Sequence, residues 1–107
     1  MGLTVECAHT PESVVVVADG EVDASTAARF KETVADAREN GKHADVYLDL
    51  TAVTFLDSAG LAALVEVASQ CHNADQKLRL VCTTRAVLNP IKLTGLDQVF
   101  TIVDSRP

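Results

Sequence analysis

The strongest constraint on the fold is the order in which two kinds of apolar pattern follow one another along the chain. Two β-rich runs, around 3–7 and 14–17, flank a turn signal at Pro11 and predict a hairpin. After the hairpin, helical spacing and strand-like runs alternate to the C-terminus. Strands of that kind need helices to cover them. The order therefore predicts one α/β domain over 1–107, with a mixed β-sheet, an N-terminal hairpin and α-helices covering the sheet.

Three stretches have the spacing of amphipathic helices. In the first, about 26–39, the apolar face consists of Ala27, Phe30, Val34 and Ala37. In the second, 58–72, the expected apolar stripe consists of Leu61, Leu64, Val65, Ala68 and His72. The third starts after Thr84, ends at Thr94-Gly95 and contains Pro90. Proline costs about 3 kcal/mol inside a regular helix, so we expect a kink or two short pieces.

The remaining strands are predicted from β-rich runs, and their ends from turn-forming residues. The later strands are expected at 46–50, 78–82 and 99–103. Asp19-Gly20 is a typical turn pair and is predicted to end the second strand of the hairpin. The segment 51–57 is predicted to be the turn between the strand at 46–50 and the second helix.

Composition bears on where the protein works and what it binds. No apolar run approaches the roughly 20 residues of a membrane span, and the N-terminus lacks the features of a secretory signal, so a soluble protein is expected. The three cysteines form no CxxC pair and leave an odd thiol under any disulfide scheme, which favours a reducing compartment, the cytoplasm. They are expected in the core. The net charge of −6 argues against nucleic acid and favours a basic protein partner.

No arrangement typical of an enzyme is found. Cys71 and His72 are neighbours, but their side chains diverge by about 100° on a helix, so no metal site is expected. The chain has no GxxxxGK[ST], no GxGxxG and no G-x-S-x-G pattern. We therefore predict a binding protein that is not an enzyme and needs no cofactor.

The most informative segment is 48–61, where a strand leads to Asp57-Ser58 at the start of a helix. The simplest interpretation of Ser58 is a helix N-cap. The residues that follow lack polar side chains, and the small ones among them are Ala59, Gly60, Ala62 and Ala63. They indicate either a docking surface or tight packing of the helix on the sheet. Gly60 in particular indicates a close approach of another backbone.

Three separated motifs resemble those of STAS-domain anti-sigma factor antagonists, a bacterial family. The first is Asp57-Ser58-Ala59-Gly60-Leu61, preceded by Leu48-Asp49-Leu50 and by Val53-x-Phe55-Leu56. The second is Gly20-Glu21-Val22-Asp23, and the third is Leu93-Thr94-Gly95-Leu96-Asp97-x-Val99-Phe100. The motifs occur in the family's order and extend the resemblance over essentially the whole chain.

The resemblance implies a phosphorylation switch. In such proteins the serine after the motif aspartate, here Ser58, is phosphorylated by an anti-sigma factor that is also a serine kinase. The unphosphorylated form binds this partner and frees a sigma factor, and a phosphoserine phosphatase restores it. The implied partner-binding residues are Asp23, Asp57, Ser58, Ala59, Gly60, Ala62 and Ala63. For Asp23 and Asp57, helix capping is an alternative role.

Other functions remain open at this point. A STAS module could serve a stress-signalling scaffold or a lipid-transport complex, and a small nucleotide-binding domain belongs to a different class. We expect a monomer or a weak dimer that contacts neither nucleic acid nor membrane.

Overall fold

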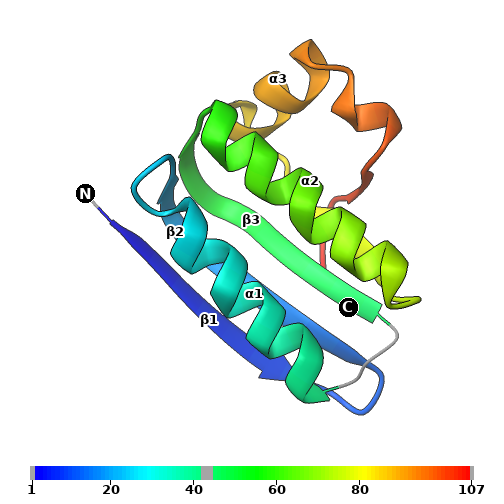
Figure 1. The fold of residues 1–107 in the computed structure, drawn as a ribbon. Coiled ribbons are helices and arrows are strands. Elements are labelled where there is room, and N and C mark those ends of the chain that lie inside the picture. The colour runs from blue at the N-terminus through cyan, green and yellow to red at the C-terminus, as the bar shows by residue number, and fades with distance from the viewer. Residues whose placement is uncertain (1, 42–44, 107) are drawn as a thin grey trace.

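A computed structural model describes residues 2–41 and 45–106 of the chain (Figure 1). Within these residues, strands and helices follow in the predicted order. They are β1 (Leu3–His9), β2 (Ser13–Val22), α1 (Ala27–Gly41), β3 (Asp45–Leu56), α2 (Ser58–Asn73), β4 (Lys77–Val81), α3 (Arg85–Leu93), the 3-10 helix η1 (Leu96–Gln98) and β5 (Thr101–Val103).

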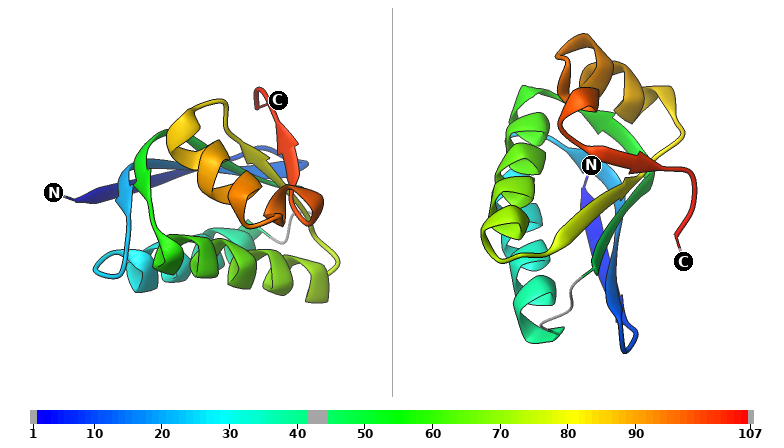
Figure 2. Two further views of the ribbon diagram at one scale, coloured as in Figure 1. Left: turned by 90° about the horizontal axis from the view of Figure 1, so that it is seen from above. Right: turned by 90° about the vertical axis from the view of Figure 1, so that its right-hand side faces the viewer.

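The strands form one sheet in the order β1-β2-β3-β4-β5, which confirms the predicted fold class. β1 and β2 are antiparallel and form the predicted hairpin, whereas β2, β3, β4 and β5 are parallel. Crossovers between parallel strands are right-handed, so successive crossovers in one direction place their helices on the same side of the sheet. Figure 2 shows α1 and α2 side by side along one face, with α3 at the end of the sheet where β3 ends.

β2 and β3 are longer than predicted. β2 continues through Asp19-Gly20 to Val22, and β3 continues through the expected turn to Leu56. Gly20 has a φ of 125° and lies where the register between the two strands shifts, so this glycine forms an irregularity within the strand. The predicted turns are wrong because hydrogen bonding between the neighbouring strands holds both segments extended. Their extensions carry the chain to the end of the sheet where α2 starts.

The buried face of α1 agrees with the prediction, but that of α2 does not. Phe30, Val34 and Ala37 are buried beneath α1. The buried residues of α2 are Gly60, Ala63, Leu64, Val67 and Cys71. Val65 is 40% exposed and His72 lies on the surface, so the stripe predicted for α2 is rotated. Apolar residues occupy nearly all positions of 59–65, and their spacing therefore does not define a face.

α3 runs unbroken through Pro90, so the prediction of two short pieces is wrong. Val87 and Ile91 on its inner face are fully buried. Burying side chains of this size contributes about 1.5–3 kcal/mol each, so the two together match or exceed the roughly 3 kcal/mol cost of the proline. The helix ends at Leu93 with Thr94 as its C-cap, and Gly95 with its φ of 76° turns the chain away, as predicted.

Gly60 fixes the position of α2 on the sheet. A Cβ at this residue would lie 2.4 Å from the carbonyl oxygen of Val22 and 2.5 Å from Cδ1 of Leu56. The backbone N–H of Asp57 also donates to the Val22 carbonyl, at 3.4 Å. The close approach expected from the sequence is thus an approach of α2 to the protein's own strand β2.

Gly60→Ala is expected to lower the free energy of unfolding by about 1–3 kcal/mol, because the backbone oxygen of Val22 cannot move aside freely. Urea denaturation followed by circular dichroism measures this change. The control is Ala62→Gly, which tests helix propensity alone at an exposed residue of α2 and should cost up to about 1 kcal/mol. Gly60→Ala at or above wild-type stability would show that α2 does not depend on this contact.

Candidate functional site

Ser58 is the first residue of α2, and its side chain is exposed. The residue that caps the helix is Asp57, whose carboxylate Oδ1 accepts the backbone N–H of Gly60 at 3.0 Å. The interpretation of Ser58 as the N-cap is therefore wrong by one residue. Within 2–41 and 45–106, the Ser58 hydroxyl makes no hydrogen bond, so it is accessible for modification without the loss of an internal contact.

Asp57, between β3 and α2, makes three hydrogen bonds, two with the first turn of α2 and one with β2. Its carboxylate binds the N–H of Gly60, its own N–H donates to Val22, and its carbonyl accepts the N–H of Leu61 at 2.9 Å. A carboxylate at this position also interacts favourably with the positive end of the helix dipole. The alternative role considered for Asp57, helix capping, is present in the structure.

Asp23 organises the turn between β2 and α1. Its Oδ1 accepts the N–H of Ser25 at 2.9 Å and the hydroxyl of Ser25 at 2.7 Å. The Ser25 hydroxyl makes the largest contribution to a lowered pKa of Asp23, so this side chain is a carboxylate at neutral pH. The buried Thr26 hydroxyl accepts the Asp23 N–H at 3.0 Å and donates to the Glu21 carbonyl at 2.9 Å, which holds the turn in place.

Val22 brings the two aspartates to the same end of the sheet. Asp23 follows Val22 in the chain, while Asp57 and Gly60 both contact the Val22 carbonyl. Parallel strands end at one edge of a sheet, and β2 and β3 pair as far as Val22 and Leu56. The motif residues predicted to act together therefore do come together.

The small residues of α2 divide into two groups. Ala62 is exposed and Ala59 is partly exposed, whereas Gly60 and Ala63 are buried against the sheet. Both interpretations of this segment thus apply, each to different residues. We call Asp23, Asp57, Ser58, Ala59 and Ala62 the Ser58 surface. Gly60 and Ala63 lie beneath it and support it, so in this conformation they do not form part of the exposed face.

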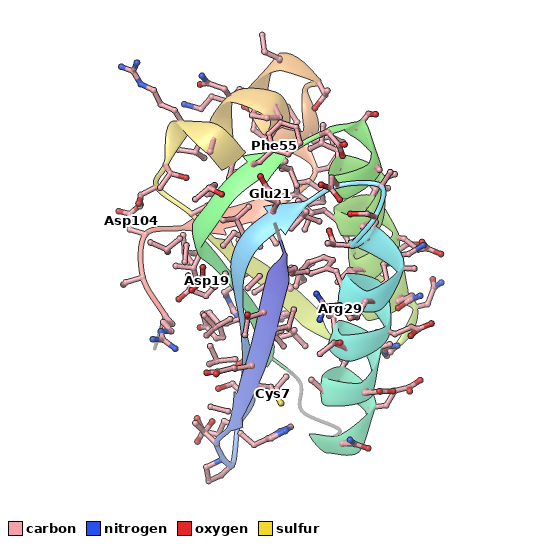
Figure 3. All side chains as sticks on the ribbon, turned by 90° about the vertical axis from the view of Figure 1, so that its left-hand side faces the viewer. Cys7, Asp19, Glu21, Arg29, Phe55 and Asp104 are labelled. Atoms are coloured by element: carbon pink, nitrogen blue, oxygen red, sulfur yellow. The ribbon has the colours of Figure 1, made fainter. Side chains whose placement is uncertain are left out.

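One aromatic residue near this end of the sheet was not among the predicted site residues. Phe55 is 47% exposed, and it is paired in register with Glu21 of β2. Figure 3 shows Glu21 and Phe55 together at this end of the sheet. The segment 51–57 was predicted to be a turn, and an exposed side chain in a turn does not indicate a contact surface. If β3 had been predicted to extend to Leu56, the large apolar side chain of Phe55 on its exposed side would have indicated a contact surface for a partner.

The remaining reactive side chains are candidate metal ligands and the three cysteines. No group of three or more His, Cys, Asp or Glu side chains there could hold a metal ion. Cys71 and Cys82 are buried as expected, but Cys7 is exposed on β1 (Figure 3). Burial, with a smaller contribution from Asp49, raises the pKa of Cys82 to about 11, so this thiol is not a nucleophile at neutral pH.

None of the helices in the described ranges is long and apolar enough to cross a bilayer.

Comparison with known proteins agrees with the motif-based resemblance. The chain is similar to the anti-sigma-B factor antagonist of Staphylococcus epidermidis, with 26% identity over 99 residues that cover 92% of this chain and 91% of the relative. It is 25% identical, with the same coverage, to the anti-sigma-B factor antagonist of Staphylococcus aureus strain NCTC 8325 / PS 47.

Solved structures have the same fold. An anti-sigma factor antagonist from Mycobacterium paratuberculosis superimposes with a TM-score of 0.87 and 27% identity, covering 97% of this chain and 87% of that one. The anti-sigma factor antagonist SpoIIAA in its unphosphorylated form gives a TM-score of 0.77 over 95% of this chain and 90% of that one. Its identity of 16% supports the fold alone.

The family model named STAS domain matches residues 4–106, which is nearly the whole chain. With the fold and the motifs in agreement, this chain belongs to the STAS domain family.

Proposed function

We propose that this protein is an anti-sigma factor antagonist that binds an anti-sigma factor through the Ser58 surface and loses that affinity when Ser58 is phosphorylated. The observation that carries the proposal is the exposed Ser58 hydroxyl, which has no hydrogen-bond partner in the described chain and adjoins the capping carboxylate of Asp57. The names of the relatives support the partner class. Binding would displace a sigma factor from the anti-sigma factor.

The phosphate donor in this proposal is the partner. The anti-sigma factor would act as a serine kinase that supplies ATP and transfers its γ-phosphoryl group to the Ser58 oxygen. A phosphoserine phosphatase would reverse the modification by hydrolysis. Both proteins would act in the cytoplasm, where sigma factors bind RNA polymerase.

The start of α2 can accept a phosphate without unfolding. The first N–H groups of a helix lack acceptors within it, and the helix dipole favours negative charge there. Asp57 uses only the N–H of Gly60. A phosphate on Ser58 would thus lie beside backbone N–H groups that can donate hydrogen bonds to it. The modification would therefore change the surface more than the fold.

The change at the surface is one of charge. Phosphorylation adds about −1.5 to −2 charges at neutral pH, next to Asp57 and near Asp23. The unmodified surface presents the methyl groups of Ala59 and Ala62, which can dock against an apolar partner face. Docking would remove water from the dianion, and an unpaired buried charge costs several kcal/mol. This cost explains how the modification would abolish binding.

Ser58→Ala is expected to change the free energy of unfolding by no more than about 0.5 kcal/mol, because the hydroxyl makes no hydrogen bond in the described chain. Asp57→Ala, its neighbour, should cost about 0.5–2 kcal/mol through loss of the cap. Urea denaturation of both variants tests the pair. A greater loss in Ser58→Ala than in Asp57→Ala would make Ser58 a structural residue.

Phosphorylated Ser58 is expected to weaken binding to the anti-sigma factor at least about 100-fold, equivalent to about 2.7 kcal/mol. At an effective dielectric near 20, two like charges about 4 Å apart repel by about 4 kcal/mol before screening, so a single carboxylate nearby suffices. Ser58→Asp carries less charge and should weaken binding less. Titration calorimetry of the unmodified, Ser58→Asp and phosphorylated forms against the anti-sigma factor measures the order of their affinities. Circular dichroism checks that all three are folded. Equal affinities among folded forms would exclude the switch.

Purified protein with magnesium and ATP is expected to stay unphosphorylated, since the sequence contains no nucleotide-binding motif. Addition of the anti-sigma factor should add one phosphate at Ser58, detected by peptide mass spectrometry. Ser25, which is also exposed but hydrogen-bonded to Asp23, is the internal control and should remain unmodified. Phosphate at Ser58 in the absence of the partner would overturn this assignment of the kinase.

A further inference from the structure

Cys7 and His9 form a pair of metal-ligand side chains on strand β1. They are two residues apart on the strand, so they lie on the same face of the sheet, and both are exposed. Sγ of Cys7 lies 3.9 Å from Nε2 of His9. Tetrahedral zinc, with bonds of about 2.3 Å to sulfur and about 2.0–2.1 Å to nitrogen, holds two such atoms roughly 3.6 Å apart. A small rotation of either side chain would therefore let the two hold one zinc ion.

Two ligands are half of a closed zinc site. Structural zinc sites almost always have four protein ligands, commonly cysteine and histidine. In the part of the chain that the structure describes, no third His, Cys, Asp or Glu side chain joins the pair. A closed site therefore needs two ligands from another molecule, and a second copy of this chain has an identical Cys–His pair to supply.

The backbone of β1 has one side bonded to β2 and one side facing outward. β1 is the first strand in the sheet and pairs with β2. The Gly2 carbonyl accepts the N–H of Glu21 at 3.2 Å, and the N–H of Thr10 donates to the Ser13 carbonyl at 2.8 Å. Backbone groups alternate in direction along an antiparallel strand, so the even-numbered residues of β1 bond to β2. The odd-numbered residues turn their N–H and C=O groups outward.

The outer edge of β1 lacks features that usually prevent pairing with another strand. Its sequence contains no lysine and no proline, and its register with β2 is uninterrupted. The Arg29 guanidinium donates to the outward carbonyl of Leu3, at the end of the strand away from Cys7. Figure 3 views this side of the molecule, with Cys7 and Arg29 labelled. Two identical edges are complementary when they pair antiparallel about a twofold axis, so a second copy fits this edge.

We propose that Cys7 and His9 bind zinc together with the same two residues of a second copy, whose β1 strand pairs antiparallel with the first. With the twofold axis at Ala8, Cys7 of each copy lies opposite His9 of the other, with Cβ atoms about 5 Å apart. The four side chains then surround one point on the axis, where two thiolates and two imidazoles coordinate the ion. Each thiol releases its proton to water on binding. An axis at Glu6 would instead place two carboxylates opposite each other, which is unfavourable.

This zinc site goes beyond the function proposed for Ser58 and does not depend on it. Cys7 and His9 belong to β1, whereas the Ser58 surface consists of residues from α2 and the two turns that precede α1 and α2. The two sites share no residue. Failure of the phosphorylation switch would therefore leave zinc binding unchanged, and the reverse also holds.

The test is a zinc titration followed by sedimentation velocity, with a phosphine reductant present to exclude disulfides. About half an equivalent of zinc should convert monomer to dimer, with a zinc Kd of about 1 μM or tighter, and a chelator should reverse the change. Cobalt(II) in place of zinc should give a thiolate-to-metal charge-transfer absorption. One zinc per chain without dimerisation, a dimer that the chelator does not dissociate, or no binding at about 100 μM zinc would overturn the proposal.

Variants identify the ligands. Cys7→Ser and His9→Ala should each weaken zinc binding at least about 100-fold and leave the protein monomeric, because each removes two of the four ligands. His72→Ala removes an exposed imidazole from α2 and is the matched control, which should dimerise like the wild type. Circular dichroism checks folding, and Cys7→Ser keeps the test valid if His9→Ala unfolds. Zinc-dependent dimerisation that persists in folded Cys7→Ser, or is lost in folded His72→Ala, would overturn the assignment.

Ala8→Glu and Ala8→Gln test the position of the twofold axis. Ala8 is exposed and lies on the opposite face of β1 from the two ligands, and the proposed axis places the two copies of Ala8 opposite each other. Two glutamates there would repel and should weaken the zinc-linked dimer at least about fivefold, whereas glutamine, of the same size, should weaken it less than about twofold. Equal dimerisation of the two variants would exclude an axis at Ala8.

Discussion

The contact between the first turn of α2 and the end of β2 is the constraint on which the Ser58 surface depends. Gly60 brings the helix backbone so close to the Val22 carbonyl that no side chain fits between them. The same carbonyl accepts the N–H of Asp57, and Val22 leads directly into Asp23. The peptide group of Val22 therefore sets the positions of the carboxylates of Asp23 and Asp57, and of Ser58, which follows Asp57. A glycine in this motif is a structural requirement for the surface and not a part of it.

In the proposed switch, two adjacent residues at the start of α2 divide two tasks, capping the helix and accepting a phosphate, that a single side chain could not perform together. A serine that capped the helix would hold its hydroxyl in a hydrogen bond to the backbone, and phosphorylation would break that bond. Because Asp57 caps the helix, the hydroxyl of Ser58 is available and its modification removes no internal contact. The negative charge of Asp57 has a further effect, since it lies beside any phosphate added to Ser58. In the proposed switch, the charge of the capping carboxylate would add to that of the phosphate and make the phosphorylated surface more negative than the phosphate alone would.

Elements with local signals were predictable from the sequence, and features set by distant partners were not. The hairpin and the buried face of α1 follow from spacing within one segment, and the structure confirms both. Asp19-Gly20 has the composition of a turn, but pairing with β3 keeps it in a strand, and the long-range pairing left no local sign. The hollow lined by Ala68, Cys71 and Val99 joins residues that lie far apart in the chain, so no local pattern predicts it. The order Asp57 then Ser58 was visible, yet which of the two caps the helix is decided by backbone geometry.

Contacts between α1 and α2 favour a local action of the phosphate over a movement transmitted along the helix. Arg38 and Gln76 exchange two hydrogen bonds, of 3.1 and 3.3 Å, which hold the loop after α2 to the last turn of α1, and the N–H of Gln76 donates to the Cys71 carbonyl of α2 at 2.8 Å. Lys31 and Glu66 form an ion pair of 2.7 Å nearer the middle, a weaker contact because both side chains are exposed. With Gly60 seated on β2 at the other end, α2 is held at both of its ends. Communication between distant sites needs an element with two arrangements, and nothing in these contacts supplies a second arrangement of α2. A charge change confined to the Ser58 surface needs no such element, so the switch proposed for Ser58 requires electrostatics alone and no movement of α2.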